Sequence, residues 1–250
     1  MKRIKKVLSC LLVMALLLGT VTAKVAASES SVALLPTDEF LIHTGMPLDE
    51  IASMDPDIKE YIVQNLKQNA ELEELEYVET TDIPVPTTLS VQVLSGISFS
   101  ASAWKSGNII YIYPTYEYTT PKKQAGKDSF AFELGASMRP YEFGGQVWTK
   151  LEPGNDWSKY GDMVANQQKL TGAEYSGTQL GNSPFSIYVK GAAYCHANVG
   201  TGTDKRIAMT YMNNPNKVNY SISFSVYGFG ITFYSNDVIY TASKISTLSF

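Results

Sequence analysis

The sequence predicts a mainly β protein, an antiparallel β-sandwich or a barrel-like relative of it, preceded by a short helical segment. Three observations predict this fold class. From residue 87 onward, apolar and polar residues alternate in short stretches rich in Tyr, Ser and Thr, as in half-buried strands. Segments with Gly, Pro and Asn separate these stretches and indicate turns. Before residue 80, apolar residues recur instead at the spacing of a helix.

The chain begins with the pattern of a secretory signal peptide. Residues 1–6 carry four positive charges, and an apolar run over residues 7–18 follows. This run of about a dozen residues is shorter than the roughly 20 that span a bilayer as a helix. Small residues at 21–23 predict cleavage near Ala23, so we expect a secreted, extracellular protein. Cys10 lies in the apolar run and would be removed with it.

The next segment, residues 24–79, is acidic and is predicted to be helical. A short helix is expected over residues 37–42, before Gly45. Asp55 and Pro56 suit the N-cap and the first position of a second helix. Apolar residues then recur at four-residue spacing, which predicts one apolar face: Ile58, Ile62 and Leu66.

Charge divides the chain at this segment. Residues 24–79 hold thirteen acidic and three basic side chains, whereas residues 80–250 hold eleven and thirteen. The segment is either a propeptide or shield that docks on the mildly basic β-domain, or a solvated spacer. Because salt screens exposed charges, we expect any docking to be weak and salt-sensitive. Two prolines in residues 80–86 predict an extended linker before the β-domain of residues 87–250. No concentrated basic patch occurs, which argues against a nucleic-acid partner.

Part of the acidic segment resembles a known kind of sequence. The run Thr44-Gly45-Met46-Pro47 is followed by Ile51, Met54, Ile58-Lys59 and Ile62 to Leu66. This pattern resembles a short helical module of secreted, uncharacterised proteins of Gram-positive bacteria. The resemblance implies secretion in such a background and supplies no catalytic residues.

Two carboxylates are candidates for catalysis. Glu117 and Glu133 lie in two aromatic-rich stretches of the β-domain. If these strands are neighbours, the two acids can flank a glycosidic bond in one cleft, as in sugar-cleaving enzymes. The alternative is that both are polar positions on a solvated strand face. Three aromatic residues are candidates for stacking on sugar rings in such a cleft: Trp104, Tyr111 and Tyr113.

Other chemistry receives less support. Cys195 and His196 are neighbours on a predicted strand, so their side chains point to opposite faces and cannot readily form a nucleophile–base pair. His43 is the other histidine, and Cys195 is expected to be a buried apolar residue.

No zinc, paired-cysteine or phosphate-loop motif occurs, so we expect no metal and no cofactor. A calcium site is a further possibility, because calcium prefers oxygen ligands and three residues with side-chain oxygens lie close in sequence. The same residues are common in turns, which explains them without a metal: Asn155, Asp156 and Asp162.

Residues 221–234 suggest a different function. Serine alternates with apolar residues over 221–227 without any charge, and a second apolar stretch follows after Gly228-Phe229-Gly230. This pattern suits a transmembrane hairpin of a pore-forming protein, and it equally suits an ordinary half-buried hairpin.

The sequence leaves three functions open. The first is a non-catalytic secreted protein that binds an extracellular glycan, protein or membrane surface, with no obligate partner. The alternative is a membrane-active, toxin-like β-protein, and the third is a glycan hydrolase on a β-sandwich.

Overall fold

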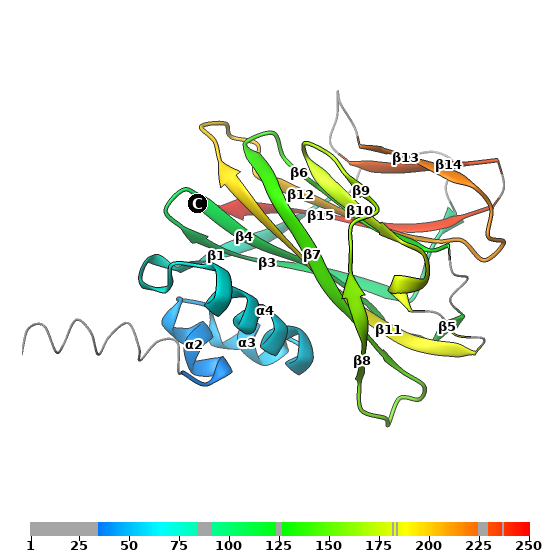
Figure 1. Ribbon diagram of the computed structural model, residues 1–250, viewed down its shortest axis with the longest axis horizontal. Coiled ribbons are helices and arrows are strands. Elements are labelled where there is room, and N and C mark those ends of the chain that lie inside the picture. Colours follow the sequence, from blue (N-terminus) through cyan, green and yellow to red (C-terminus); the bar gives the residue numbers. More distant parts are fainter. Residues whose placement is uncertain are drawn as a thin grey trace, which may run out of the picture.

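The computed structural model describes residues 35–84, 92–123, 127–181, 183, 185–224, 230–236 and 238–250. The expected signal peptide and residues 85–86 of the expected linker lie outside the described residues. The described chain is mainly β-structure preceded by short helices (Figure 1). The predicted fold class, a barrel-like β-sandwich after a short helical segment, is therefore confirmed.

Short helices open the described chain, and none of them is long and apolar enough to cross a membrane. Asp55 caps the longest helix as predicted, because its side chain accepts the backbone N–H groups of Asp57 and Ile58 at 3.0 and 3.2 Å. The predicted apolar face is buried, including Ile62 and Leu66. The helices are α2 (Thr37–His43), α3 (Leu48–Ser53) and α4 (Pro56–Asn69), followed by the 3₁₀ turn η1 (Leu72–Glu74).

The strands follow one continuous, mainly antiparallel path that curls into two packed layers (Figure 1). The first layer has the order β8 (Ser158–Met163), β7 (Met138–Lys150), β11 (Ser186–Val199), β4 (Ile109–Tyr118), β3 (Ile97–Ser106) and β1 (Glu76–Ile83). The second layer continues with β15 (Tyr240–Ser249), β12 (Arg206–Asn213), β6 (Ser129–Leu134), β10 (Gly172–Ser176) and β9 (Gln167–Gln168).

Three further pairings and one short turn complete the β-structure. β2 (Gln92–Val93) pairs with β15 in parallel, and β5 (Lys122–Lys123) pairs with β11. The turn η2 (Gly177–Leu180) follows β10. A separate two-stranded sheet consists of β13 (Tyr220–Phe224) and β14 (Ile231–Ser235).

The expected boundary between helical segment and β-domain is wrong. Residues 76–83 form strand β1, although residues up to 79 were expected to be helical and residues 80–86 to be a linker. β1 pairs first with β3 and then, from Glu79, with β15, so it joins the two layers. These neighbours, distant in sequence, satisfy the backbone hydrogen bonds of β1 and make it a strand.

The main core lies between the two layers and is rich in aromatic side chains. Tyr116 of the first layer contacts Phe130 and Tyr211 of the second, with ring centroids 4.8 and 5.0 Å apart. Cys195 also lies in this core and is fully buried, as the sequence predicts. Burial raises the pKa of its thiol well above the ordinary range, so Cys195 is a structural apolar residue.

Two core tyrosines allow a matched test of hydroxyl burial. In the described chain the Tyr116 hydroxyl is buried without a hydrogen-bond partner, whereas the Tyr211 hydroxyl donates to the buried Asp128 carboxylate at 3.2 Å. We expect Tyr116→Phe to raise the free energy of unfolding by about 1 kcal/mol and Tyr211→Phe to lower it by about 1.5 kcal/mol. Urea unfolding of both variants measures this difference, and equal losses in the two would contradict it.

Candidate functional site

The helices cover the outer face of the first layer through a second hydrophobic cluster. Buried residues of α2 and α4 pack there on aromatic side chains of β3, β4 and β7. Apolar burial accompanies this docking, so we now expect it to depend less on salt than the charge pattern of the sequence predicts. The helical members include Phe40, Leu41, Ile62 and Leu66, and the strand members include Trp104, Tyr111, Tyr113 and Trp148.

The three candidate sugar-stacking residues lie beneath this helical layer. Trp104 and Tyr113 are fully buried, and Tyr111 is 3% exposed. Their polar atoms bond to the helical segment: Trp104 Nε1 donates to Thr44 Oγ1 at 2.9 Å, and the hydroxyls of Tyr111 and Tyr113 donate to Asn69 O and Asn65 Oδ1 at 3.0 and 2.7 Å. The prediction that these aromatics form an exposed sugar-binding surface is wrong, because alternation places them on the face that the helices cover.

The two candidate catalytic acids lie on opposite sides of the sandwich. Glu117 is on β4 and points away from the core toward the start of α4, since its neighbour Tyr116 points inward. Glu133 is on β6 of the second layer, between the core residues Phe132 and Leu134, and it also points away from the core. Burial raises the pKa of both carboxyls. With the whole core between them, they cannot flank one bond, so the predicted hydrolytic pair is wrong.

A buried ion cluster fixes α4 on the first layer. Lys190 of β11 is fully buried, and its Nζ lies 2.5 Å from Asp55 Oδ1 and 2.6 Å from Asp57 Oδ2. The same ammonium lies 4.4 Å from the centroid of the Trp157 ring. Asp55 therefore both caps α4 and binds the strand beneath it.

His196 occupies a second polar position under the helices. Its Nδ1 lies 3.0 Å from Glu142 Oε2, and its Nε2 lies 3.3 Å from Asn65 Oδ1. Burial lowers the pKa of His196, and the Glu142 carboxylate opposes that shift. His196 points to the helices and Cys195 to the core, so the prediction that the two side chains lie on opposite faces of the strand is confirmed. His43 is exposed on α2.

The residues considered for calcium are arranged as an ordinary turn. The backbone N–H of Asn155 donates to the carbonyl of Glu152 at 3.1 Å. Asp162 lies in β8 and pairs with Lys159 at 2.9 Å. In the part of the chain that the structure describes, no cluster of three His, Cys, Asp or Glu residues is placed to hold a metal ion.

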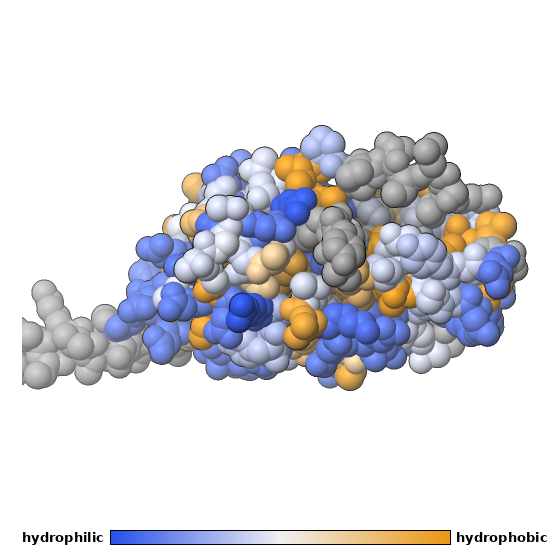
Figure 2. Space-filling view, turned by 90° about the horizontal axis from the view of Figure 1, so that it is seen from above, coloured by the Kyte–Doolittle hydropathy of each residue, from blue (hydrophilic) through white to orange (hydrophobic). Residues whose placement is uncertain are grey.

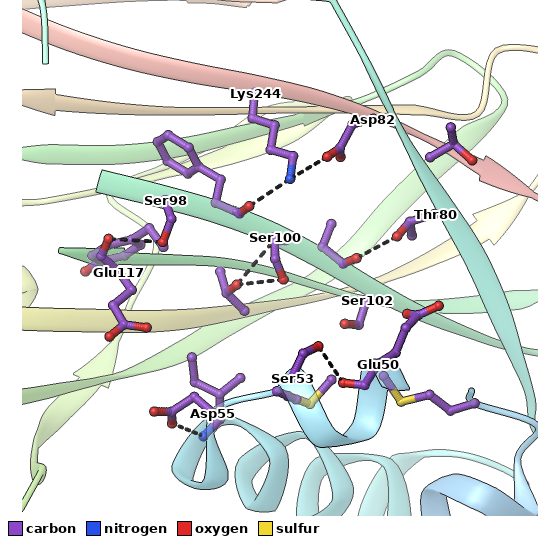
Figure 3. A pocket seen from close by; sticks show the side chains of 18 residues that line it. Glu50, Ser53, Asp55, Thr80, Asp82, Ser98, Ser100, Ser102, Glu117 and Lys244 are labelled. Carbon is purple, nitrogen blue, oxygen red and sulfur yellow. Dashed lines mark hydrogen bonds and ion pairs between the residues drawn. The ribbon is translucent and has the colours of Figure 1, made fainter. Parts of the chain in front are cut away.

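A polar groove of about 570 Å³ lies between α3, the start of α4 and strands β1, β3 and β4 (Figure 3). Hydroxyls from β3 and β4 line its floor, and carboxylates line its sides. The groove is lined by residues from several elements that lie far apart in the chain. The sequence showed only that some of these residues lie on a polar face of a strand, so it did not predict the groove. The polar lining includes Ser98, Ser100, Ser102, Thr115, Glu117, Glu50, Asp55, Asp82 and Lys244.

A hairpin covers part of the outer face of the second layer. β13 and β14 pair only with each other, which confirms the predicted hairpin over the described residues 220–224 and 230–235; residues 225–229 lie outside them. Ser221 and Ser223 are exposed, whereas the intervening apolar side chains turn toward the second layer. These side chains, Ile222, Phe224, Ile231 and Phe233, form a small cluster with Ala131, Met212 and Ile239.

Two carboxylates beneath the hairpin bind it to the second layer. Glu133 accepts the backbone N–H of Gly230 at 3.0 Å. Glu174 accepts the hydroxyl of Tyr220 at 2.9 Å and that of Ser129 at 2.7 Å. Figure 2 shows that hydrophobic residues occur in separate patches among hydrophilic ones on the face seen from above.

Comparison with known proteins gives little beyond this geometry. No family model matches the chain, and no curated protein matches it. Among solved structures, a "Pore forming protein" is 6% identical, with 68% of this chain and 90% of that chain covered and a TM-score of 0.38.

Two other solved structures show weaker likeness. The KRT10-binding region domain of the pneumococcal serine rich repeat protein PsrP is 16% identical, with 57% and 88% covered and a TM-score of 0.33. AvmM, which catalyzes macrocyclization in Alchivemycin A biosynthesis, is 13% identical, with 66% and 86% covered and a TM-score of 0.20. Because these TM-scores are below 0.5, the likenesses carry no argument about function.

Proposed function

We propose that the protein is secreted and acts without catalysis as a membrane-active β-protein, whose β13–β14 hairpin inserts into a lipid bilayer. The observation that carries this proposal is a hairpin whose two strands, over the described residues, pair only with each other and turn one apolar side toward the second layer. The signal-like start of the chain supports secretion. The separation of Glu117 and Glu133 removes the main support for a hydrolase.

The sequence of the hairpin is suited to crossing a bilayer. No charged side chain occurs between Lys217 and Asp237. This stretch leaves about nine residues for each arm, close to the 9–11 residues of a tilted membrane strand. Serine alternates with apolar residues along the first arm. In a membrane, the apolar side would face lipid and the serine side would face water.

The hairpin can leave the second layer without disturbing the main core. Its apolar residues belong to a separate cluster, and of the four only Phe233 is buried. A released hairpin would expose unpaired strand edges, which are costly in lipid. Closure with hairpins from further copies would satisfy those edges, so we expect insertion to involve several copies of the chain.

Dye-loaded liposomes test this proposal directly. The secreted form is expected to release dye. Ile222→Cys and Ser223→Cys, each labelled with an environment-sensitive fluorophore, provide a matched pair of neighbours on opposite hairpin faces. On liposomes we expect a blue-shifted, brighter signal at position 222 and little change at position 223. Cys195 will not react in the folded protein because it is fully buried.

Two outcomes would count against insertion. One is the absence of dye release across anionic, zwitterionic and sterol-containing liposomes by correctly folded protein. The other is an equal fluorescence change at positions 222 and 223, which would indicate adsorption to the membrane surface without a lipid-facing strand side.

A further inference from the structure

We infer that the polar groove between α3 and strands β1, β3 and β4 binds a short oligosaccharide that carries free primary amines, such as an oligomer of glucosamine, without cleaving it. The groove lies on the first layer, whereas the hairpin lies on the second, so this inference is independent of membrane insertion.

The floor of the groove is a ladder of hydroxyl groups. Ser98, Ser100 and Ser102 alternate along β3 and therefore face the same side, with about 7 Å between successive side chains. Thr115 of β4 lies opposite Ser100, and its hydroxyl donates to the Ser100 carbonyl at 3.2 Å. In the described chain no partner lies within hydrogen-bond distance of the Ser102 hydroxyl. A hydroxyl both donates and accepts, which matches the hydroxyls of a sugar.

The walls of the groove carry more negative than positive charge. Lys244 is paired with Asp82 at 2.8 Å, and its ammonium also donates to a backbone carbonyl. Among the described residues, the Glu50 carboxylate accepts the neutral hydroxyl of Tyr77 and has no ion-pair partner. The Glu117 carbonyl accepts the Ser98 hydroxyl at 3.4 Å, whereas its carboxylate has no hydrogen-bond or ion-pair partner among the described residues and points into the groove (Figure 3). An added cation would therefore meet at least one carboxylate that has no ion-pair partner among the described residues.

The direction of the Glu117 pKa shift agrees with a position among other carboxylates. Burial, and the negative charge of Asp55 beside it, raise the pKa of the Glu117 carboxyl, while Lys190 acts in the opposite direction. A ligand ammonium would favour the ionised carboxylate and supply up to three hydrogen-bond donors.

Other ligands fit the groove less well. A lysine side chain of a peptide could lay its methylene stem along Met46, Met54 and Ile58, but it would leave the hydroxyls of the floor without partners in the ligand. A neutral sugar would leave the Glu117 charge unmatched. Cleavage would need a second free carboxylate near Glu117, and Asp55 is already bound to Lys190 and to the start of α4.

Calorimetric titration of the secreted form tests the inference. The ligands are a β-1,4-linked glucosamine trimer and its fully N-acetylated counterpart, at pH 6 and low salt. The amine-bearing trimer is expected to bind at least about tenfold more tightly, because only it places a charged donor against Glu117. Glu117→Gln is expected to weaken its binding by about tenfold, and Ser100→Val by a smaller factor. The control is Glu152→Gln in an exposed turn, which should bind as the parent does.

Three results would overturn the inference. They are equal affinity for the two trimers, unchanged affinity in both groove variants, and cleavage of the trimer detected by mass spectrometry. Unfolding midpoints of each variant show whether a loss of binding reflects a loss of fold. Because Ser100 is exposed on a strand, its variant remains informative even if Glu117→Gln is unstable.

Discussion

A chain that begins at Glu76, without the helical layer, is expected to fail to form a stable soluble monomer. It would expose Trp104, Tyr111, Tyr113 and Trp148, each at most 4% exposed in the whole chain. Aromatic side chains bury about 150–250 Å² each, so the loss of burial is on the order of 10 kcal/mol. That loss is comparable to the whole stability of a typical domain. Dye binding to exposed apolar surface and size-exclusion chromatography measure the effect.

The control for this deletion is the unfolding midpoint of the whole chain, measured at low and at high salt. If apolar burial holds the helices, the unfolding midpoint should change little between low and high salt, because salt screens charges and leaves apolar contacts in place. A shortened chain that stays monomeric and unfolds cooperatively at the parent's temperature would show instead that the helical segment is a spacer.

Replacing Lys190 with methionine is expected to lower the free energy of unfolding by about 3 kcal/mol. The change removes one partner of a buried ion cluster and leaves the Asp55 and Asp57 carboxylates facing each other without a cation, which typically costs 3–5 kcal/mol. The lower end applies because the Asp55 and Asp57 side chains are 19% and 39% exposed, so that water screens them. Urea unfolding measures the loss.

A triple variant separates the charge effect from general damage to the interface. Lys190→Met combined with Asp55→Asn and Asp57→Asn removes every charge of the cluster, and asparagine at position 55 keeps the N-cap of α4. We expect its stability to lie within about 1 kcal/mol of the parent, because an uncharged interface of similar volume is commonly tolerated. If the triple variant were as unstable as Lys190→Met alone, packing rather than charge would explain the loss.

Local signals in the sequence account for several features of the structure. The Asp55-Pro56 cap, the apolar face of α4, the buried Cys195 and the hairpin around residues 221–234 all follow from patterns within a few residues. Such patterns are reliable because capping and alternation depend on near neighbours along the chain.

The predictions that the structure contradicts failed for a different reason, because they depend on contacts between distant parts of the chain. β1 became a strand because β3 and β15 pair with it, and Tyr111 and Tyr113 of β4 became buried because helices from another part of the chain cover them. The sequence could show that Glu117 and Glu133 lie on strands, yet it could not show that those strands belong to different layers.

By itself, the sequence determined the class of fold, the positions of the helical segment and of most strands, and an uncharged hairpin. Tertiary structure alone decided which face each strand turns to a partner. That choice buried the aromatic candidates, separated the two acids and assembled the groove of hydroxyls and carboxylates. The physical reason is that alternation specifies two faces for a strand, while the elements that cover each face are distant in the chain.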